Sequence, residues 1–189
     1  MKAILLIAMS LVSFSASADY FKAGLGFNVG GEVEYSAPAG STTGDWDSTF
    51  MTPLLLAYGF DMMGDVYGEV ELGYRKHEIK DIGGFTVINE PTFLTAAFNI
   101  VGNAPMGAVT LTGGAGAFFG QYDPDDTTSD AGTGFGLQLF GGVDFAVNEA
   151  MTIGGELRYM TTVSDIGLDN SVDAEYTSTA VMINAKFGM

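Results

Sequence analysis

Apolar and polar residues alternate with a period of two along eight segments of the chain, and none of these segments keeps a helical period. Segment 135–145 is the clearest, because apolar residues recur at its odd positions with glycine or polar residues between them. The eight segments are 21–30, 50–60, 67–75, 93–100, 109–119, 135–145, 152–159 and 181–187. Each is close to the roughly ten residues that a tilted strand needs to cross a bilayer. The pattern therefore predicts eight membrane-crossing strands.

The connections between these segments alternate between short and long. Short connections are expected at 62–65, 102–107 and 148–150, and long polar ones at 36–48, 77–90, 121–133 and 162–175. Bacterial outer-membrane barrels have short periplasmic turns and long external loops, with both termini on the periplasmic side. The predicted fold class is therefore all-β, as an eight-stranded antiparallel up-and-down transmembrane β-barrel.

Composition supports a membrane barrel and excludes other classes. The chain is 47% hydrophobic with a mean hydropathy of +0.25, yet no apolar run after residue 18 is long enough to span a bilayer as a helix. Its formal net charge of −16 lacks the basic footprint of a nucleic-acid-binding protein, so no nucleic-acid partner is expected. The absence of cysteine excludes disulfides and thiolate metal sites.

The first eighteen residues have the layout of an export signal. Lys2 supplies the positive start, residues 3–12 are apolar, and Ala16, Ser17 and Ala18 form a small-residue cleavage site. We expect residues 1–18 to be a cleaved signal peptide and residues 19–189 to form the outer-membrane barrel domain. The expected location is the bacterial outer membrane, where the assembly machinery and outer-membrane lipid, lipopolysaccharide included, are the expected partners.

Charges of both signs fall on the polar faces of the predicted strands. An eight-stranded barrel is only wide enough inside for side chains to fill it, and an unpaired buried charge costs several kcal/mol. We therefore expect a structural ion-pair network in the interior, formed by Lys22, Glu69, Glu71, Arg75, Asp144, Glu156, Arg158 and Lys186. Glu32 and Glu34 join that face if the first strand continues without a bulge. The functional alternative is a narrow ion path through the same charges.

Aromatic residues cluster near the expected strand ends, which predicts two interfacial girdles. The periplasmic girdle would contain Tyr20, Phe21, Phe60, Tyr67, Phe145 and Phe187. The external girdle would contain Tyr35, Phe50, Tyr74, Phe119, Tyr122, Phe135, Tyr159 and Tyr176. A further group, Asp123, Asp125, Asp126 and Asp130, lies in one long loop without the spacing of an EF-hand, so we interpret it as a solvated acidic loop.

Enzymatic chemistry has little support in the sequence. Outer-membrane lipid-modifying enzymes pair a histidine with a serine and an acid. The single histidine, His77, lies at the outer end of the third strand, and no serine stands near it on the same inward face. We therefore expect His77 to be a surface residue, and the chain to be no enzyme, with no catalytic residue, cofactor or metal.

Residues 141–159 read GGVDFAVNEAMTIGGELRY: a glycine-rich strand, a short turn, and a strand with the pattern acid-x-Arg-Tyr. This hairpin resembles the penultimate hairpin of the OmpA/OmpX/Opa-like family of small outer-membrane barrels. The resemblance implies an eight-stranded barrel with Glu156 and Arg158 at interior positions. Members serve as structural links, adhesins, invasion factors or small pores. We expect a sealed monomeric barrel with a structural or adhesin-like role, whose external loops contact a surface ligand. The alternatives are a small porin for ions or solutes and, third, a lipid-modifying enzyme using His77.

Overall fold

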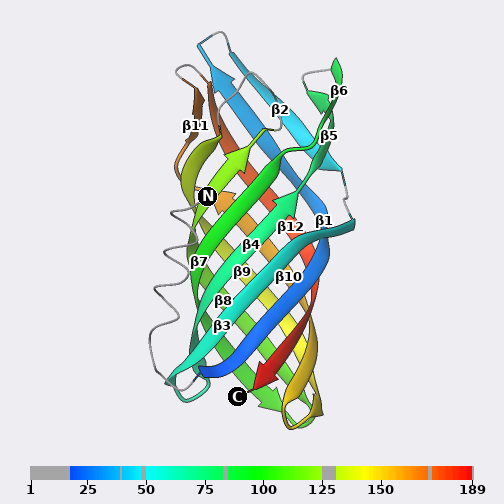
Figure 1. The fold of residues 1–189 in the computed structure, drawn as a ribbon, viewed down its shortest axis with the longest axis vertical. Coiled ribbons are helices and arrows are strands. Elements are labelled where there is room, and N and C mark those ends of the chain that lie inside the picture. The colour runs from blue at the N-terminus through cyan, green and yellow to red at the C-terminus, as the bar shows by residue number, and fades with distance from the viewer. Residues whose placement is uncertain are drawn as a thin grey trace.

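The computed structural model describes residues 18–38, 40–47, 50–82, 85–124, 131–169 and 172–188, and these fold into a single antiparallel sheet of twelve strands. Eight long strands form a closed barrel, because the last strand pairs with the first (Figure 1). They are β1 (Ala18–Ala37), β3 (Phe50–Met63), β4 (Val66–Lys76), β7 (Thr92–Met106), β8 (Val109–Asp123), β9 (Gly132–Asn148), β10 (Met151–Thr162) and β12 (Val172–Gly188). No described helix is long and apolar enough to cross a membrane.

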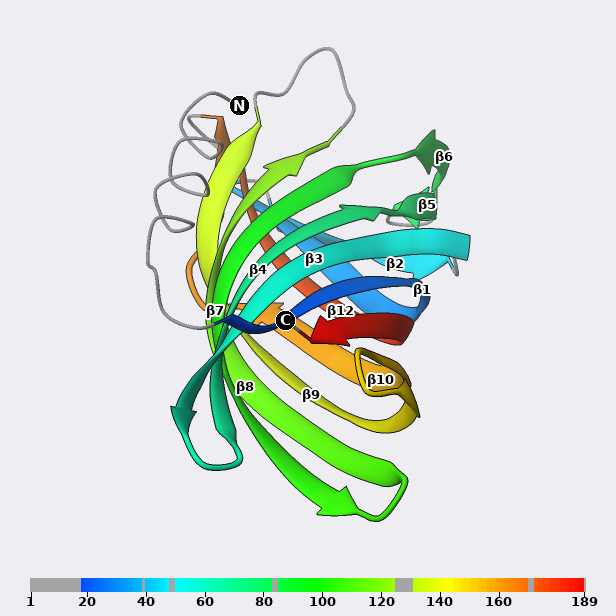
Figure 2. The same cartoon turned by 60° about the horizontal axis from the view of Figure 1, so that its bottom comes forward.

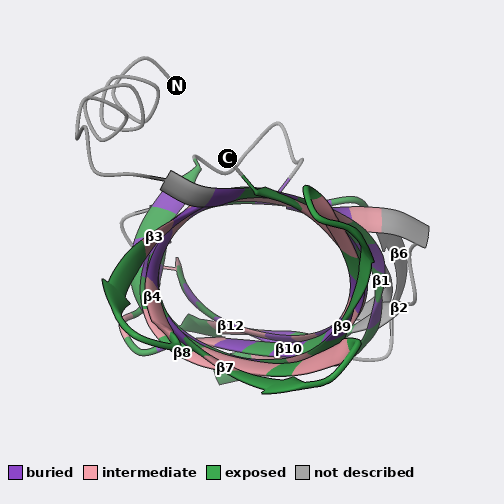
Figure 3. Cartoon of the chain, turned by 90° about the horizontal axis from the view of Figure 1, so that it is seen from below, coloured by how far each residue is buried: buried purple, intermediate pink, exposed green. Residues whose placement is uncertain are grey.

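The alternation in the sequence becomes an outer apolar surface and an inner mixed one. On β9, Leu137 and Leu139 are 52% and 61% exposed, whereas Gln138 between them is buried. The same odd–even contrast runs around the barrel, which appears end-on as a closed ring in Figure 3. A continuous band of exposed apolar side chains on a closed sheet fits a bilayer, because the sheet leaves no edge whose backbone groups would lack partners. The predicted fold class and its eight crossings are thereby confirmed.

At one end of the barrel, here called the short-turn end, three two-residue turns connect the strands (Figure 2). Gly64 and Gly107 occupy the first turn positions with φ of 60° and 74°, a conformation that hairpin turns require and that glycine adopts without strain. The third turn is held by Asn148, whose side-chain oxygen accepts a hydrogen bond from the Ala150 amide at 2.9 Å. The second turn is tighter than the expected connection 102–107, because β7 continues to Met106.

The opposite end, here called the long-connection end, carries more strand than the sequence predicted. The segments expected to be loops contain β2 (Gly40–Asp47), β5 (Glu78–Ile82), β6 (Phe85–Asn89) and β11 (Ile166–Asp169). The upper half of β1 pairs with β2, which pairs with β5, so this end forms a small sheet above the barrel wall (Figure 1). The alternation of apolar and polar residues did not predict these strands, because strands outside lipid need no apolar face and these segments are polar. The aspartates at 125, 126 and 130 lie outside the described residues.

A bulge in β1 changes which residues face inward. The register of β1 against β12 shifts between Asn28 and Gly30, and one extra residue reverses the side-chain parity beyond it. Val33 is consequently buried inside the barrel, while Glu32 is exposed on the outer surface. The conditional prediction that Glu32 and Glu34 face the interior is therefore wrong.

Glycines and aromatic rings fill the narrow interior together. A Cβ atom added to Gly114 would lie 2.4 Å from Cζ of Phe140, and one added to Gly136 would lie 2.1 Å from Cζ of Phe118. Each ring thus occupies the space above a glycine on the neighbouring strand. This interlocking explains why the inward faces of β8 and β9 are rich in glycine.

Candidate functional site

The interior nearer the short-turn end contains a buried ion-pair network with two cationic centres. Lys22 Nζ, from β1, lies 2.9 Å from Glu156 Oε2 and 3.6 Å from Glu69 Oε2. Arg158 is fully buried and pairs with Glu71 across the barrel and, at 2.8 Å, with Glu156 on its own strand. Glu156 therefore joins both cations into one network that spans the interior from β1 and β10 to β4.

Neutral polar groups and one ring complete this network. Asn99 donates to Glu69 and Glu71, and its own oxygen accepts a 2.6 Å hydrogen bond from Gln138. The ring of Phe140 lies 4.6 Å from the Arg158 guanidinium carbon and 5.0 Å from Lys22 Nζ, within the range of a cation–π interaction. Asn99 and Gln138 carry the inward parity of their strands, so alternation alone could have identified them as interior residues.

Three of the predicted residues, Arg75, Asp144 and Lys186, lie apart from this network. Arg75 is buried closer to the long-connection end, where its Nη1 donates to Ser178 Oγ at 3.4 Å. Lys186 pairs with Asp144 at 2.5 Å, close to the short-turn end. The eight predicted residues are therefore all inward-facing, but the structure distributes them over three levels rather than one centre.

His77 is the clearest departure from the sequence interpretation. It is fully buried, so the expectation of a surface residue is wrong. Its Nδ1 lies 3.2 Å from Asn28 Nδ2 and its Nε2 lies 2.7 Å from the Tyr176 hydroxyl. Ser178 belongs to the same cluster, because its hydroxyl donates to the oxygen of Asn28 at 3.1 Å. The imidazole is thus a member of a buried hydrogen-bonded cluster, with both ring nitrogens engaged and no exposed face.

Above the ionic levels, apolar and aromatic side chains close the barrel toward the long-connection end. The Phe93 and Tyr176 rings lie 4.3 Å apart, and the Phe118 ring packs edge-on against Phe93 at 5.8 Å. The hydroxyls of Tyr35 and Tyr122 meet at 2.6 Å. The buried members of this apolar cluster are Val33, Phe93, Ala97, Phe118, Tyr122, Met160, Ile166, Leu168, Ala174 and Tyr176.

This packing corrects the predicted girdles. Tyr122 and Tyr176 face the interior, and Tyr20 also faces inward, with its hydroxyl donating to Glu69 at 3.0 Å. The Tyr67 ring lies 5.9 Å from that of Tyr20 on the same side. The exposed girdle aromatics that remain are Phe21, Phe145 and Phe187 near the short-turn end, and Phe135 and Tyr159 on the outer face. The hydroxyls of Tyr20, Tyr35, Tyr122 and Tyr176, four residues of the predicted girdles, have hydrogen-bond partners inside the barrel.

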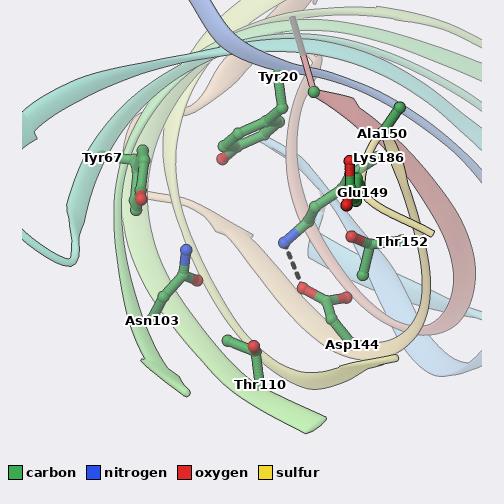
Figure 4. Close-up of a pocket in the computed structure, with 10 residues that line it drawn as sticks. Tyr20, Tyr67, Asn103, Thr110, Asp144, Glu149, Ala150, Thr152 and Lys186 are labelled. Carbon is green, nitrogen blue, oxygen red and sulfur yellow. Dashed lines mark hydrogen bonds and ion pairs between the residues drawn. The ribbon is translucent and has the colours of Figure 1, made fainter. Parts of the chain in front are cut away.

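The short-turn end of the interior holds a cavity of about 210 Å³, here called the mouth cavity (Figure 4). The Lys186–Asp144 pair lies on one side of it, and the rings of Tyr20 and Tyr67 lie on another. It is lined by Tyr20, Tyr67, Asn103, Thr110, Asp144, Glu149, Ala150, Thr152, Lys186 and Gly188.

The eight predicted interior charges sum to zero. The cations are Lys22, Arg75, Arg158 and Lys186 and the anions are Glu69, Glu71, Asp144 and Glu156, although Arg75 contacts Ser178 rather than one of these carboxylates. A set of charges without a net sign gives no overall field that would favour one sign of ion. No group of three potential metal ligands occurs among the described residues.

Comparison with known proteins identifies a family with this architecture. The family model described as "Outer membrane protein beta-barrel domain" matches residues 4–187. A search of curated protein sequences returns no match.

Solved structures agree with the observed fold. OprG, an outer membrane protein from Pseudomonas aeruginosa, superposes with a TM-score of 0.64 at 16% identity, covering 92% of this chain and 97% of its own. Neisserial surface protein A (NspA) superposes with a TM-score of 0.61 at 15% identity, covering 90% of this chain and 96% of its own. At such identities the likeness shows the fold alone.

Proposed function

The chain belongs to the outer membrane protein beta-barrel domain family, and we propose that it is a non-conducting barrel that presents its long-connection end at the cell surface in a structural or adhesin-like role. The resemblance of hairpin 141–159 to small outer-membrane barrels agrees with this family. In such barrels the short-turn end faces the periplasm and the long connections face outward. The short-turn end is accordingly the periplasmic side.

The observation that carries the proposal is the filled interior. Lys22 and Arg158 cross-link β1, β4 and β10 through buried carboxylates. An ion entering this level would have to displace partners that already satisfy each charge, and removing one partner of a buried pair costs about 3–5 kcal/mol.

A second barrier of different chemistry lies above the first. In the apolar cluster between the ionic levels and the long-connection end, the Phe93 ring contacts both the Phe118 and the Tyr176 ring. A hydrated ion meets mostly apolar surface there, because the tyrosine hydroxyls of this level already have partners, and an apolar constriction resists wetting. Two consecutive barriers of opposite character support a sealed barrel.

The surface role rests on what the long-connection end presents. Its described strands and connections carry many carboxylates and few cations. Those whose side chains the structure describes are the acidic residues Glu32, Glu34, Asp45, Glu78, Glu90, Asp123, Asp165, Asp173 and Glu175, and the cation Lys76. This charge favours contact with a basic surface, or with lipopolysaccharide phosphates through divalent cations.

The test is single-channel recording of the refolded chain in planar bilayers, with a heat-modifiable gel shift as the control for folding. We expect no discrete openings from the wild type. The double variant Phe93→Ala, Phe118→Ala removes two rings of the apolar cluster but keeps the ion-pair network, so it should also stay silent. Adding Arg158→Ser opens the ionic level as well, and this triple variant should show openings. Steady openings of the wild type would contradict the sealed barrel.

A small channel for ions or solutes is the second candidate, because polar side chains form a column from the mouth cavity to Asn99 and Gln138. In that case the wild type would conduct, and Lys22→Met would change its ion selectivity. A lipid-modifying enzyme has no such support, since His77 is buried inside the barrel with both ring nitrogens engaged.

The remaining assignments follow from the barrel as proposals. We propose that residues 1–18, of which 1–17 lie outside the described residues, are removed as a signal peptide. We also propose that the assembly machinery inserts the barrel and that it acts as a monomer. N-terminal sequencing of the protein from outer membranes, expected to begin at Asp19, tests the first of these.

A further inference from the structure

We propose that the mouth cavity is a binding site for a small aliphatic amine on the periplasmic side of the barrel. The site is separate from the surface role, and it requires no conduction because the ion-pair network lies behind it. Its walls come from β1, β4, β7, β8, β9, β10 and β12 and from the β9–β10 turn, so the closed barrel itself fixes its shape (Figure 4).

The cavity contains a buried hydrogen-bond acceptor that has no donor among the described residues. Oδ1 of Asn103 is buried and accepts no hydrogen bond within the described part of the chain, and the side chain points into the cavity in Figure 4. A buried acceptor left without a donor costs about 1–3 kcal/mol, which a bound donor would recover. Glu149, exposed at the rim, adds a carboxylate. Asn103 Oδ1 and the Glu149 carboxylate are therefore two acceptors that a bound donor could reach from the cavity.

Charge and aromatic surface point to a cationic donor. Within the cavity lining, Lys186 is balanced by Asp144, so Glu149 leaves a net negative charge. The Tyr20 ring already holds one ammonium, since Lys186 Nζ lies 5.4 Å from its centroid. Tyrosine faces attract ammonium groups, and a carboxylate strengthens their hydrogen bonds. An anionic ligand would meet Glu149 and the oxygen of Asn103 instead, and both would repel it.

The volume limits the size of the ligand. About 210 Å³ corresponds to roughly seven water molecules at about 30 Å³ each. A four-carbon diamine has six non-hydrogen atoms and fits this space. One of its ammonium groups would lie near Asn103 and the other near Glu149, which stand on different sides of the cavity in Figure 4.

The experiment is an NMR titration of the refolded barrel in detergent micelles with butane-1,4-diamine, using butane-1,4-diol as the neutral control. We expect saturable shifts at Tyr20, Asn103 and Glu149, with a dissociation constant on the order of 1 mM, and none with the diol. Absence of saturable shifts with up to about 20 mM diamine would overturn the site.

Two variants separate this site from general attraction to an acidic protein. Glu149→Gln changes an exposed turn residue and should weaken binding about tenfold, and Asn103→Leu should do the same by removing the free acceptor. Glu175→Gln removes the same charge from the outer face of β12, at the other end of the barrel, and should leave binding unchanged. Equal losses in Glu149→Gln and Glu175→Gln, or no loss in Glu149→Gln, would refute the proposal.

Discussion

Replacing Arg158 by methionine tests the ion-pair network most directly. The guanidinium pairs with Glu71 and Glu156 and stacks on Phe140, and its side chain has no exposed surface. Methionine keeps much of the volume and removes the charge. Glu156 retains Lys22 at 2.9 Å, but Glu71 keeps only the 3.3 Å hydrogen bond from Asn99. Glu71 is therefore the group left without a counter-charge.

The expected cost follows from this single orphaned carboxylate. Removing one partner of a buried pair destabilises by about 3–5 kcal/mol, and the retained Asn99 contact places the value near the lower limit, at roughly 3 kcal/mol. The assay is equilibrium urea unfolding of the barrel in lipid vesicles, followed by tryptophan fluorescence and the gel shift.

A double variant distinguishes the loss of the pair from damage to packing. Glu71→Gln in the Arg158→Met background removes the stranded charge and should recover most of the stability, as a double-mutant cycle measures. If Arg158→Met unfolds within about 0.5 kcal/mol of the wild type, or if the double variant recovers nothing, the network does not stabilise the barrel as argued.

Two further predictions use neighbouring residues as matched controls. Gly114→Ala should destabilise the barrel by about 1–3 kcal/mol, because its Cβ would overlap the Phe140 ring. Gly113→Ala, whose Cβ has no atom closer than 3.8 Å, should change stability by less than about 0.5 kcal/mol. Urea unfolding compares the two variants, and equal effects would contradict the packing of aromatic rings over glycines. Val33→Asp should reduce the yield of folded barrel in the gel-shift assay while Glu32→Gln does not, and the opposite result would contradict the bulge in β1.

Alternation predicted the barrel well because lipid acts on every second residue of every crossing. It placed Glu156 and Arg158 inside and Leu137 and Leu139 outside, as the structure has them. Alternation alone did not locate the bulge after Asn28, because it does not record one extra residue; the glycines at 30 and 31, a residue type common at bulges, were the available signal.

Interior packing depends on pairings that a one-dimensional pattern does not contain. Tyr20 and Tyr176 stand near strand ends, where rings commonly meet lipid headgroups, but a hydroxyl acceptor inside the barrel drew each of them inward. His77 follows the last residue of β4, and only the closure of β1 against β12 brings Asn28 and Tyr176 to its two nitrogens. Such residues could be identified only once the register across the barrel was known.

Membership of the family does not determine whether the barrel conducts ions. A barrel of eight strands fixes the width of the interior, but the side chains inside decide whether an ion can pass. Here the paired charges of the ion-pair network fill one level of the interior, and the rings of Phe93, Phe118 and Tyr176 fill a second level toward the outer end. Side-chain changes at both levels would alter conduction without altering the fold that OprG and NspA share with this chain. A sealed barrel and a pore would therefore differ at these two levels, and bilayer recordings of variants that open one level or both discriminate between them.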